Sequence, residues 1–293
     1  PTSNPFVNRE FLSTQEFLDS VSTGFLDPLV DAARNTFATN NANDTWALAE
    51  TNLGQFAFYA QDEWAVNPNF TLTVGVRMDL PLYFDTKEKI EENIARSCCY
   101  DPTIQYFDED ANPVTFDHTV LPKQTPLISP RVGFNWDIKG DRSSQLRGGS
   151  GLFTGRFPFV WIGNQVANPN SFFYCVTDPD FKFPQVWRSN LGFDQKFDGG
   201  WTGTIDVVYT KDVNAMMVRN FGLKKPTGSL DGVDNRPVYL PADRGANVAY
   251  VFTNVKEGYS LNTTLQVTKN WRDGSSLMVG YNFLDAKDAA SID

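Results

Sequence analysis

The chain has 293 residues, of which 35 are acidic and 25 are basic, so its formal net charge is −10 at pH 7. This charge and a pI near 4.7 argue against a nucleic-acid partner, because phosphate is bound by basic surfaces. The mean hydropathy is −0.35 and no run of eighteen apolar residues occurs, so we predict no membrane-spanning helix.

The first part of the chain, residues 1–52, has a helical rather than a strand-like pattern. Apolar pairs such as Phe17-Leu18 recur along it, and Gly24 and Pro28 interrupt the pattern. This spacing predicts short amphipathic helices that end at the interruptions. We interpret the segment as an ordered loop with short helices rather than as a separate domain.

From residue 53 onward, amphipathic segments of about ten residues follow one another in pairs. Short links join the two members of a pair, and long excursions separate one pair from the next. We expect eight antiparallel strands at residues 55–64, 70–80, 130–138, 145–154, 185–197, 201–212, 258–271 and 277–285. The long excursions are residues 81–127, 155–184 and 213–258. All short links therefore lie at one end of the strands.

The expected strands have one apolar and one polar face, because side chains alternate across a strand. In residues 258–271, for example, Leu261 and Leu265 share a face, whereas Thr264 and Gln266 share the other. A water-soluble sheet with one solvated face has the same alternation. The tryptophans distinguish the two cases, because four of them lie near the short links with apolar parity: Trp64, Trp136, Trp201 and Trp271.

Aromatic residues at one level of a sheet are typical of a membrane interface. We therefore predict an all-β fold, an antiparallel transmembrane β-barrel with short helices in its extracellular loops. The short links become periplasmic turns, the four tryptophans a periplasmic aromatic girdle, and the long excursions extracellular loops. The expected lumen-facing residues are Arg77, Asp79, Arg131, Asp137, Arg147 and Asp206.

The number of strands in the barrel is the next question. Eight strands can close a small barrel, but small barrels rarely carry loops of this length. At roughly thirty residues per strand and loop, a barrel of about 22 strands needs on the order of 650 residues. We therefore expect the chain to be an internal portion of a large barrel.

Few residues suggest reaction chemistry. The single histidine, His118, lies in the excursion 81–127 and is expected at the surface. Asp108, Asp110 and Asn112 begin like a calcium loop but lack its glycine and closing glutamate. No serine, histidine and acid form a convincing set, so we expect no enzymatic activity, no cofactor and no metal site.

The excursions also contain aromatic residues and all three cysteines. The aromatics of 155–184 could contact a solute or pack between loops, and packing is the preferred interpretation. Disulfides form outside the cell, so one bridge from Cys175 to Cys98 or Cys99 is expected. A strained Cys98–Cys99 bond and three free thiols are the alternatives. The aromatic residues concerned are Phe157, Phe159, Trp161, Phe172, Phe173 and Tyr174.

Several motifs, in order and spacing, resemble the barrel of TonB-dependent receptors. The segments are Gln61-Asp62-Glu63-Trp64, Asn67-Pro68-Asn69-Phe70, Gly75-Val76-Arg77-Met78-Asp79, Ser129-Pro130-Arg131-Val132-Gly133-Phe134 and Leu146-Arg147-Gly148-Gly149. Residues 208–214 and 256–260 look like the Oar-like branch of that family.

The resemblance implies active transport of a solute, such as an oligosaccharide, a peptide or a metal chelate, across the outer membrane of a Gram-negative bacterium. It implies outer-membrane lipid around the barrel, and a plug domain outside this stretch that contacts TonB. A surface lipoprotein or another outer-membrane protein is a further conceivable partner. The alternative is a surface adhesion or scaffolding protein built on the same barrel.

Overall fold

The structure is a computed structural model, and it describes residues 50–96, 100–108, 110–167, 173–245 and 248–288. All but the last three residues of the predicted helical segment 1–52 lie outside these ranges. Neither α-helix in the described ranges is long and apolar enough to cross a membrane.

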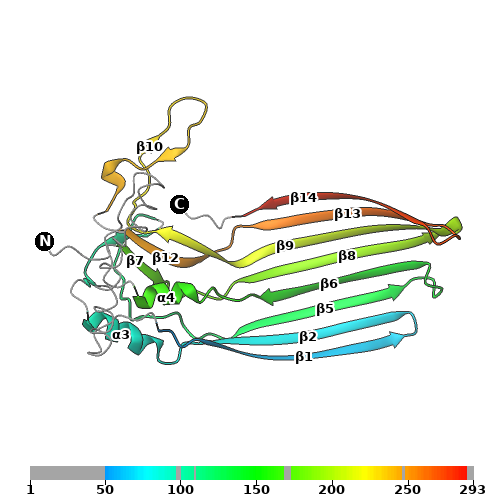
Figure 1. Ribbon diagram of the computed structural model, residues 1–293, viewed down its shortest axis with the longest axis horizontal. Helices are drawn as coiled ribbons and strands as arrows, with labels where there is room; N and C mark the ends of the chain where they lie inside the picture. Colours follow the sequence, from blue (N-terminus) through cyan, green and yellow to red (C-terminus); the bar gives the residue numbers. More distant parts are fainter. Residues whose placement is uncertain (1–49, 97–99, 109, 168–172, 246–247, 289–293) are drawn as a thin grey trace, which may run out of the picture.

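Eight long strands form one continuous antiparallel sheet (Figure 1). In spatial order they are β1 (Gly54–Asn67), β2 (Phe70–Leu82), β5 (Leu127–Asp137), β6 (Ser144–Thr154), β8 (Gln185–Phe197), β9 (Trp201–Asn220), β13 (Tyr259–Asn270) and β14 (Ser276–Lys287). Each expected strand is confirmed, and the ends differ by at most three residues, except in β9. That strand continues from the expected end at residue 212 to Asn220.

The four short links all lie at one end of the sheet, the right-hand end in Figure 1. Local chemistry closes them tightly. Between β5 and β6, the carboxylate of Asp137 accepts hydrogen bonds from the backbone N–H groups of Gly140 and Arg142 at 3.0 and 2.8 Å. Between β8 and β9, Gly200 has φ +83°, and a Cβ there would collide with the carbonyl oxygen of Asn270. Only glycine fits that position without strain.

The long excursions fold together at the opposite end of the sheet (Figure 1). They contain elements that the alternation pattern did not predict: α3 (Thr86–Arg96), β3 (Tyr106–Phe107), β4 (Pro113–Val114), α4 (Val160–Ala167), β7 (Phe173–Thr177), β10 (Gly228–Ser229), β11 (Pro237–Val238) and β12 (Val248–Val255). We call the described parts of residues 83–126, 155–184 and 213–258 the loop cap.

The buried core of the molecule lies in the loop cap, not in the long sheet. One apolar cluster comprises Ile90, Leu127, Phe157, Ile162, Val166, Phe181, Phe183 and Phe252. A second comprises Tyr106, Tyr174, Val176, Phe221, Ala249 and Val251. Burial of this apolar surface holds three excursions from distant parts of the sequence together.

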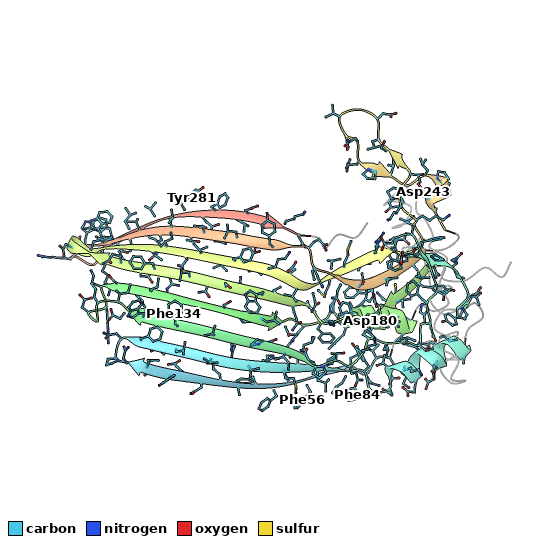
Figure 2. The ribbon with its side chains drawn as sticks, turned by 180° about the vertical axis from the view of Figure 1, so that it is seen from behind. Phe56, Phe84, Phe134, Asp180, Asp243 and Tyr281 are labelled. Atoms are coloured by element: carbon cyan, nitrogen blue, oxygen red, sulfur yellow. The ribbon has the colours of Figure 1, made fainter. Side chains whose placement is uncertain are left out.

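The long sheet, by contrast, leaves many apolar side chains of one face exposed. Phe58, Val279 and Tyr281 are 59%, 62% and 64% exposed. Figure 2 shows Phe56 and Tyr281 projecting from the two outer strands, β1 and β14. An apolar face of this extent on an antiparallel sheet needs a covering medium, because soluble proteins rarely expose large contiguous apolar patches.

Candidate functional site

The candidate site is the polar face of the long sheet, which strand pairing assembles row by row. Arg77 and Asp79 lie two residues apart on β2 and therefore on one face. The Nε and Nη2 atoms of Arg77 donate to the two carboxylate oxygens of Asp79 at 2.8 and 2.7 Å. Gln55 of β1 donates its Nε2 to the same carboxylate at 2.8 Å. The carboxylate is fully buried by these partners, whereas Arg77 stays partly exposed.

A second row crosses β2, β5, β6 and β8 through Gly75, Arg131, Gly151 and Arg188. Arg131 lies across Gly75 and donates its Nη2 to Gln61 of β1 at 2.5 Å. A Cβ on Gly75 would lie 2.9 Å from the Nε of Arg131. The glycine therefore lets a long cationic side chain lie flat against the sheet.

A third row, nearer the short links, has the same construction. Arg147 of β6, Gly192 of β8 and Asp206 of β9 are neighbours in register. Arg147 binds Asp206 through its Nη1 and Nη2 atoms, both at 2.8 Å, and Asp194 through its Nε at 3.0 Å. Two carboxylates thus surround one guanidinium, so this row carries no excess positive charge.

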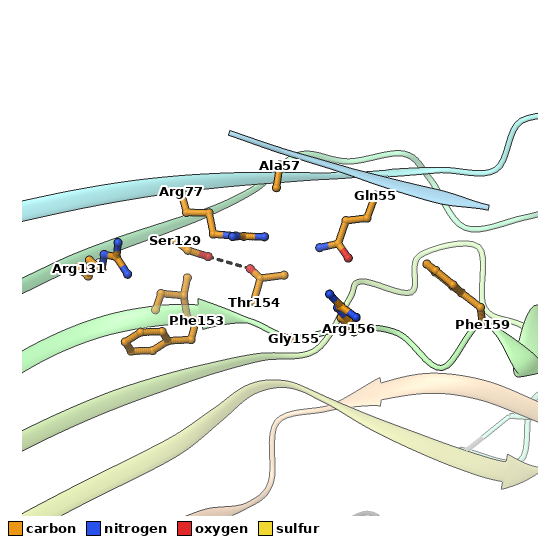
Figure 3. A pocket seen from close by; sticks show the side chains of 11 residues that line it. Gln55, Ala57, Arg77, Ser129, Arg131, Phe153, Thr154, Gly155, Arg156 and Phe159 are labelled. Atoms are coloured by element: carbon orange, nitrogen blue, oxygen red, sulfur yellow. Dashed lines mark hydrogen bonds between the residues drawn. The ribbon is translucent and has the colours of Figure 1, made fainter. Parts of the chain in front are cut away.

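The first two rows lie nearer the loop cap than the third. Together with the base of the cap they border a hollow of about 560 Å³. Figure 3 shows Arg77, Arg131 and Arg156 around it, with Phe159 at its cap side. On its floor, the hydroxyls of Ser129 and Thr154 are hydrogen-bonded at 2.8 Å. The full lining is Gln55, Ala57, Arg77, Ser129, Arg131, Leu152, Phe153, Thr154, Gly155, Arg156 and Phe159.

Two lining or wall residues, Arg156 and Arg188, were not selected from the sequence, whereas Phe159 was named there among the aromatics that could contact a solute. Arg156 and Phe159 lie in the excursion after β6. Polar and apolar residues do not alternate there, so the sequence did not indicate which way these side chains point. Arg188 could have been found, because it shares strand parity with Asp194. Of the selected residues, the structure brings Arg77, Asp79 and Arg131 to the hollow region and Arg147 with Asp206 to the third row. Asp137 instead holds its own turn.

The four tryptophans of the expected girdle all lie at the short-link end. Trp64, Trp136, Trp201 and Trp271 are between 40% and 62% exposed. Lys269 lies over two of their rings, 4.9 Å from the centroid of Trp201 and 5.8 Å from that of Trp271. This arrangement places a cation and aromatic rings at one level of the sheet, where cation–π attraction holds them together.

His118 is not at the surface, so that expectation is wrong. The rings of Tyr100 and Tyr174 contact it edge-on, at 5.3 and 4.7 Å between centroids, and its side chain is fully buried. Burial lowers the pKa of His118 to about 4. Neither ring nitrogen has a hydrogen-bond partner within the described ranges. The expectation failed because residues far apart in the sequence fold over His118 and bury it.

The remaining sequence candidates are satisfied locally or lie outside the described ranges. The carboxylate of Asp108 accepts hydrogen bonds from the backbone N–H groups of Asp110 and Asn112, which gives an ordinary turn. No group of histidine, cysteine and carboxylate side chains in the described part of the chain could hold a metal ion. Cys175 is buried in β7, but Cys98 and Cys99 lie outside the described residues. The disulfide therefore stays a prediction.

Some of the aromatic residues of the excursion 155–184 pack inside the loop cap, and others are exposed. Phe157 and Tyr174 are buried in the two clusters, and Trp161 packs against Phe252 at 4.8 Å between ring centroids. Phe159 is 37% exposed at the hollow. Phe172 and the side chain of Phe173 lie outside what the structure describes.

The chain is similar, at low sequence identity, to several solved structures of receptors and transporters. They include a mutant of the ferric enterobactin receptor PfeA from Pseudomonas aeruginosa (12% identity, 79% of this chain, TM-score 0.49) and the FrpB iron transporter from Neisseria meningitidis (14%, 80%, 0.42). A third is the outer membrane transporter YddB from Escherichia coli (10%, 80%, 0.37). The chain spans 26%, 26% and 34% of their respective lengths. No curated protein sequence matches the chain.

The family is shown by the sequence itself. Residues 6–172, more than half of the chain, match the model described as an outer membrane beta barrel domain. The described part of that match contains β1, β2, β5 and β6, which pair in order and carry the apolar and polar faces described above. The apolar face thus has its covering medium in the lipid of the Gram-negative outer membrane, and the chain belongs to the outer membrane beta-barrel domain family.

Proposed function

We propose that this chain forms part of the wall and the extracellular cap of a TonB-dependent transporter that imports a solute. The observation that supports it best is the polar face, where arginines lie flat beside glycines and leave open space in front of the wall. A closed, packed interior would instead fill such a face with interdigitating side chains. The motif resemblance to the Oar-like branch belongs to the same proposal.

The proposed topology follows from the two unlike ends of the sheet. The short links are periplasmic turns, with the four tryptophans at the inner membrane–water boundary, and the loop cap is extracellular. Residues 1–52 are a further extracellular loop segment. Arg77, Asp79, Arg131, Asp137, Arg147 and Asp206 face the lumen.

The proposal requires more strands than the structure describes. Within the described ranges, β1 and β14 each pair with one strand only. Open edges in a membrane leave backbone groups without partners, so both must be covered. We propose further strands on both sides, in a barrel of about 22 strands. A plug inside it would prevent leakage and contact TonB.

The test is solute uptake by cells that carry the complete protein, with and without a working TonB system. We expect uptake only with TonB. Equal uptake in both strains would identify a passive pore. The solute pool should include oligosaccharides, peptides and metal chelates, the classes of solute that the motif resemblance implies.

A second candidate, surface adhesion or scaffolding, is favoured by one feature. The hairpin of β10 and β11 projects away from the rest of the loop cap (Figure 1), and Val233 at its tip is fully exposed. Absence of uptake in both strains, together with loss of cell-surface binding after deletion of residues 229–237, would support this candidate instead.

A further inference from the structure

We infer that the hollow at the junction of wall and loop cap binds an oxyanion group, a carboxylate or a phosphate, of the transported solute. The inference deepens the proposed function, since it gives the solute a charge class. It rests on three properties of the hollow: its charge, the fixed position of its cations, and its shape.

The charge of the hollow is positive although the chain as a whole is acidic. Three of its lining residues are arginines, and none is a carboxylate. Asp79, the carboxylate that binds two of the lining residues, Arg77 and Gln55, is fully buried. Arg131 donates to a neutral amide, that of Gln61. Arg156 forms no ion pair with any residue in the described ranges. Two positive charges therefore stay uncompensated in a chain of net charge −10.

Two of the three arginines are held in position before any solute arrives. The bidentate bond to Asp79 fixes Arg77, and the bond to Gln61 across Gly75 fixes Arg131. In Figure 3, Gln55 and Arg156 lie toward the cap side of the hollow, Arg131 lies at the opposite side, and the side chain of Arg77 lies between them. Fixed donors lose less side-chain entropy when a ligand binds.

Guanidinium groups are suited to oxyanions in particular. Their planar fork donates two parallel hydrogen bonds to a carboxylate or a phosphate, and such charge-assisted bonds are roughly twice as strong as neutral ones. The volume of about 560 Å³ is that of a small-molecule site rather than of a macromolecular one. Phe153 and Phe159, both partly exposed, offer apolar surface for the uncharged part of the solute.

A second hollow along the same wall supports a direction of passage for the solute. It shares Arg131 and Phe153 with the first, and it adds Arg188, which lies opposite Gly151 in register. The positive charge thus continues along the half of the wall that lies nearer the loop cap. It ends at Arg147, whose charge Asp194 and Asp206 neutralise. An anion is therefore attracted to the half of the wall nearer the loop cap and is not held in the half nearer the short links.

The experiment measures anion binding by the purified complete protein in detergent, at low ionic strength, by isothermal titration calorimetry. Citrate and pyrophosphate serve as carboxylate and phosphate probes, and triethyl citrate serves as the neutral analogue. The test variant carries Arg131→Gln and Arg156→Gln. The control is Arg236→Gln, which removes one positive charge from the surface of the loop cap, where the exposed Arg236 pairs with Asp234. Cold and heated samples on gel electrophoresis check that each variant is folded.

We expect at least one charged probe to bind, the neutral analogue not to bind, and the double variant to weaken binding by about tenfold or more. The control should change affinity by less than about twofold. Binding of citrate alone would identify a carboxylate site, and binding of pyrophosphate alone a phosphate site. Failure of both anions to bind the wild type, or equal loss in the control, would overturn the inference.

The outcome is separable from that of the proposed function. TonB-dependent uptake without anion binding would remove the site and leave the transporter. Anion binding with TonB-independent uptake would leave the site and remove the transporter.

Discussion

Arg147 reaches Asp206 across the backbone of Gly192, so one ion pair joins β6 and β9 over the strand between them. Both terminal nitrogens of the guanidinium lie 2.8 Å from the carboxylate oxygens. A Cβ on Gly192 would lie 2.7 Å from the Cζ atom of Arg147 and closer still to Asp206. The absence of a side chain at position 192 is thus a condition for the pair.

Gly192→Ala should therefore break or displace this ion pair. We expect a loss of about 1–3 kcal/mol in the free energy of unfolding, because a half-buried charge network loses its geometry. Urea unfolding in liposomes measures the effect. Gly280→Ala is the control, since the nearest atom to its new Cβ would be 3.8 Å away. Equal losses in both variants would contradict the role of Gly192.

The two faces of β13 predict opposite responses to an introduced charge. Leu265→Arg places a cation on the apolar face and should cost about 2–4 kcal/mol near the membrane midplane, less toward the interface. Gln266→Arg places it on the polar face and should cost far less. Val207→Arg and Thr264→Arg form a second pair with the same contrast. The measurement is the folded fraction in liposomes, and similar losses within each pair would mean that the faces are wrongly assigned.

The two ends of the sheet predict which tags are accessible on intact cells. An epitope inserted after Gly232, in the projecting hairpin, should bind antibody without permeabilisation. An epitope after Lys139, in the short link between β5 and β6, should bind only after the outer membrane is opened. Staining of both on intact cells would invalidate the topology.

Acid should weaken the packing of the loop cap around His118. Its pKa is about 4 in the folded state, below the ordinary 6.5, so between these values only the unfolded state takes up the proton. Stability is therefore complete above pH 6.5 and falls as the pH decreases toward 4, by up to about 3 kcal/mol. Thermal unfolding followed by near-ultraviolet circular dichroism at pH 7.5 and pH 5 measures this. His118→Phe should reduce the pH dependence, and an unchanged dependence would implicate other groups.

The base of the projecting hairpin depends on one carboxylate. Asp243 accepts hydrogen bonds from the backbone N–H groups of Thr227 and Leu240 at 2.9 and 2.8 Å (its place is labelled in Figure 2). These bonds lower its pKa, so their stabilisation is complete above the ordinary value near 4 and is lost as the pH falls below it. Asp243→Asn should expose both amides to faster hydrogen exchange at neutral pH. Asp234→Asn, at the exposed tip, should leave them protected.

The strands of the wall could be read from the sequence because their two faces meet different surroundings. Strand β8 matches the expected range at both ends, with Pro184 before it and a Gly199-Gly200 pair after it. The extension of β9 beyond residue 212 could not be read in this way. There Ala215 is buried, and both Met216 and Val218 pack against the apolar cluster, so polar and apolar residues no longer alternate.

The loop cap was less predictable for two different reasons. Helix α3 had a local signal, because Ile90 and Ile94 are four residues apart and face the same core, but it lies in the excursion 81–127, which was predicted only as a long loop. The burial of His118 had no local signal, since its neighbours Tyr100 and Tyr174 come from different excursions. Arg156 likewise had no local signal, because the orientation of its side chain depends on how the cap folds. Long-range packing, not local propensity, decides such positions.

Strand β9 belongs to the wall and to the cap at once. It pairs with β13 from Trp201 to Lys211 and with β12 from Ala215 to Asn220, and β12 pairs in turn with β7. One continuous strand therefore runs from the wall into the folded loops, with a change of hydrogen-bonding partner between Lys211 and Ala215. This part of the cap cannot swing like a hinged lid, because such a motion would bend β9 or break its ladder. A force on this part of the cap therefore acts directly on the wall. Under the proposed transport function, a solute would enter past the segments that this strand does not anchor.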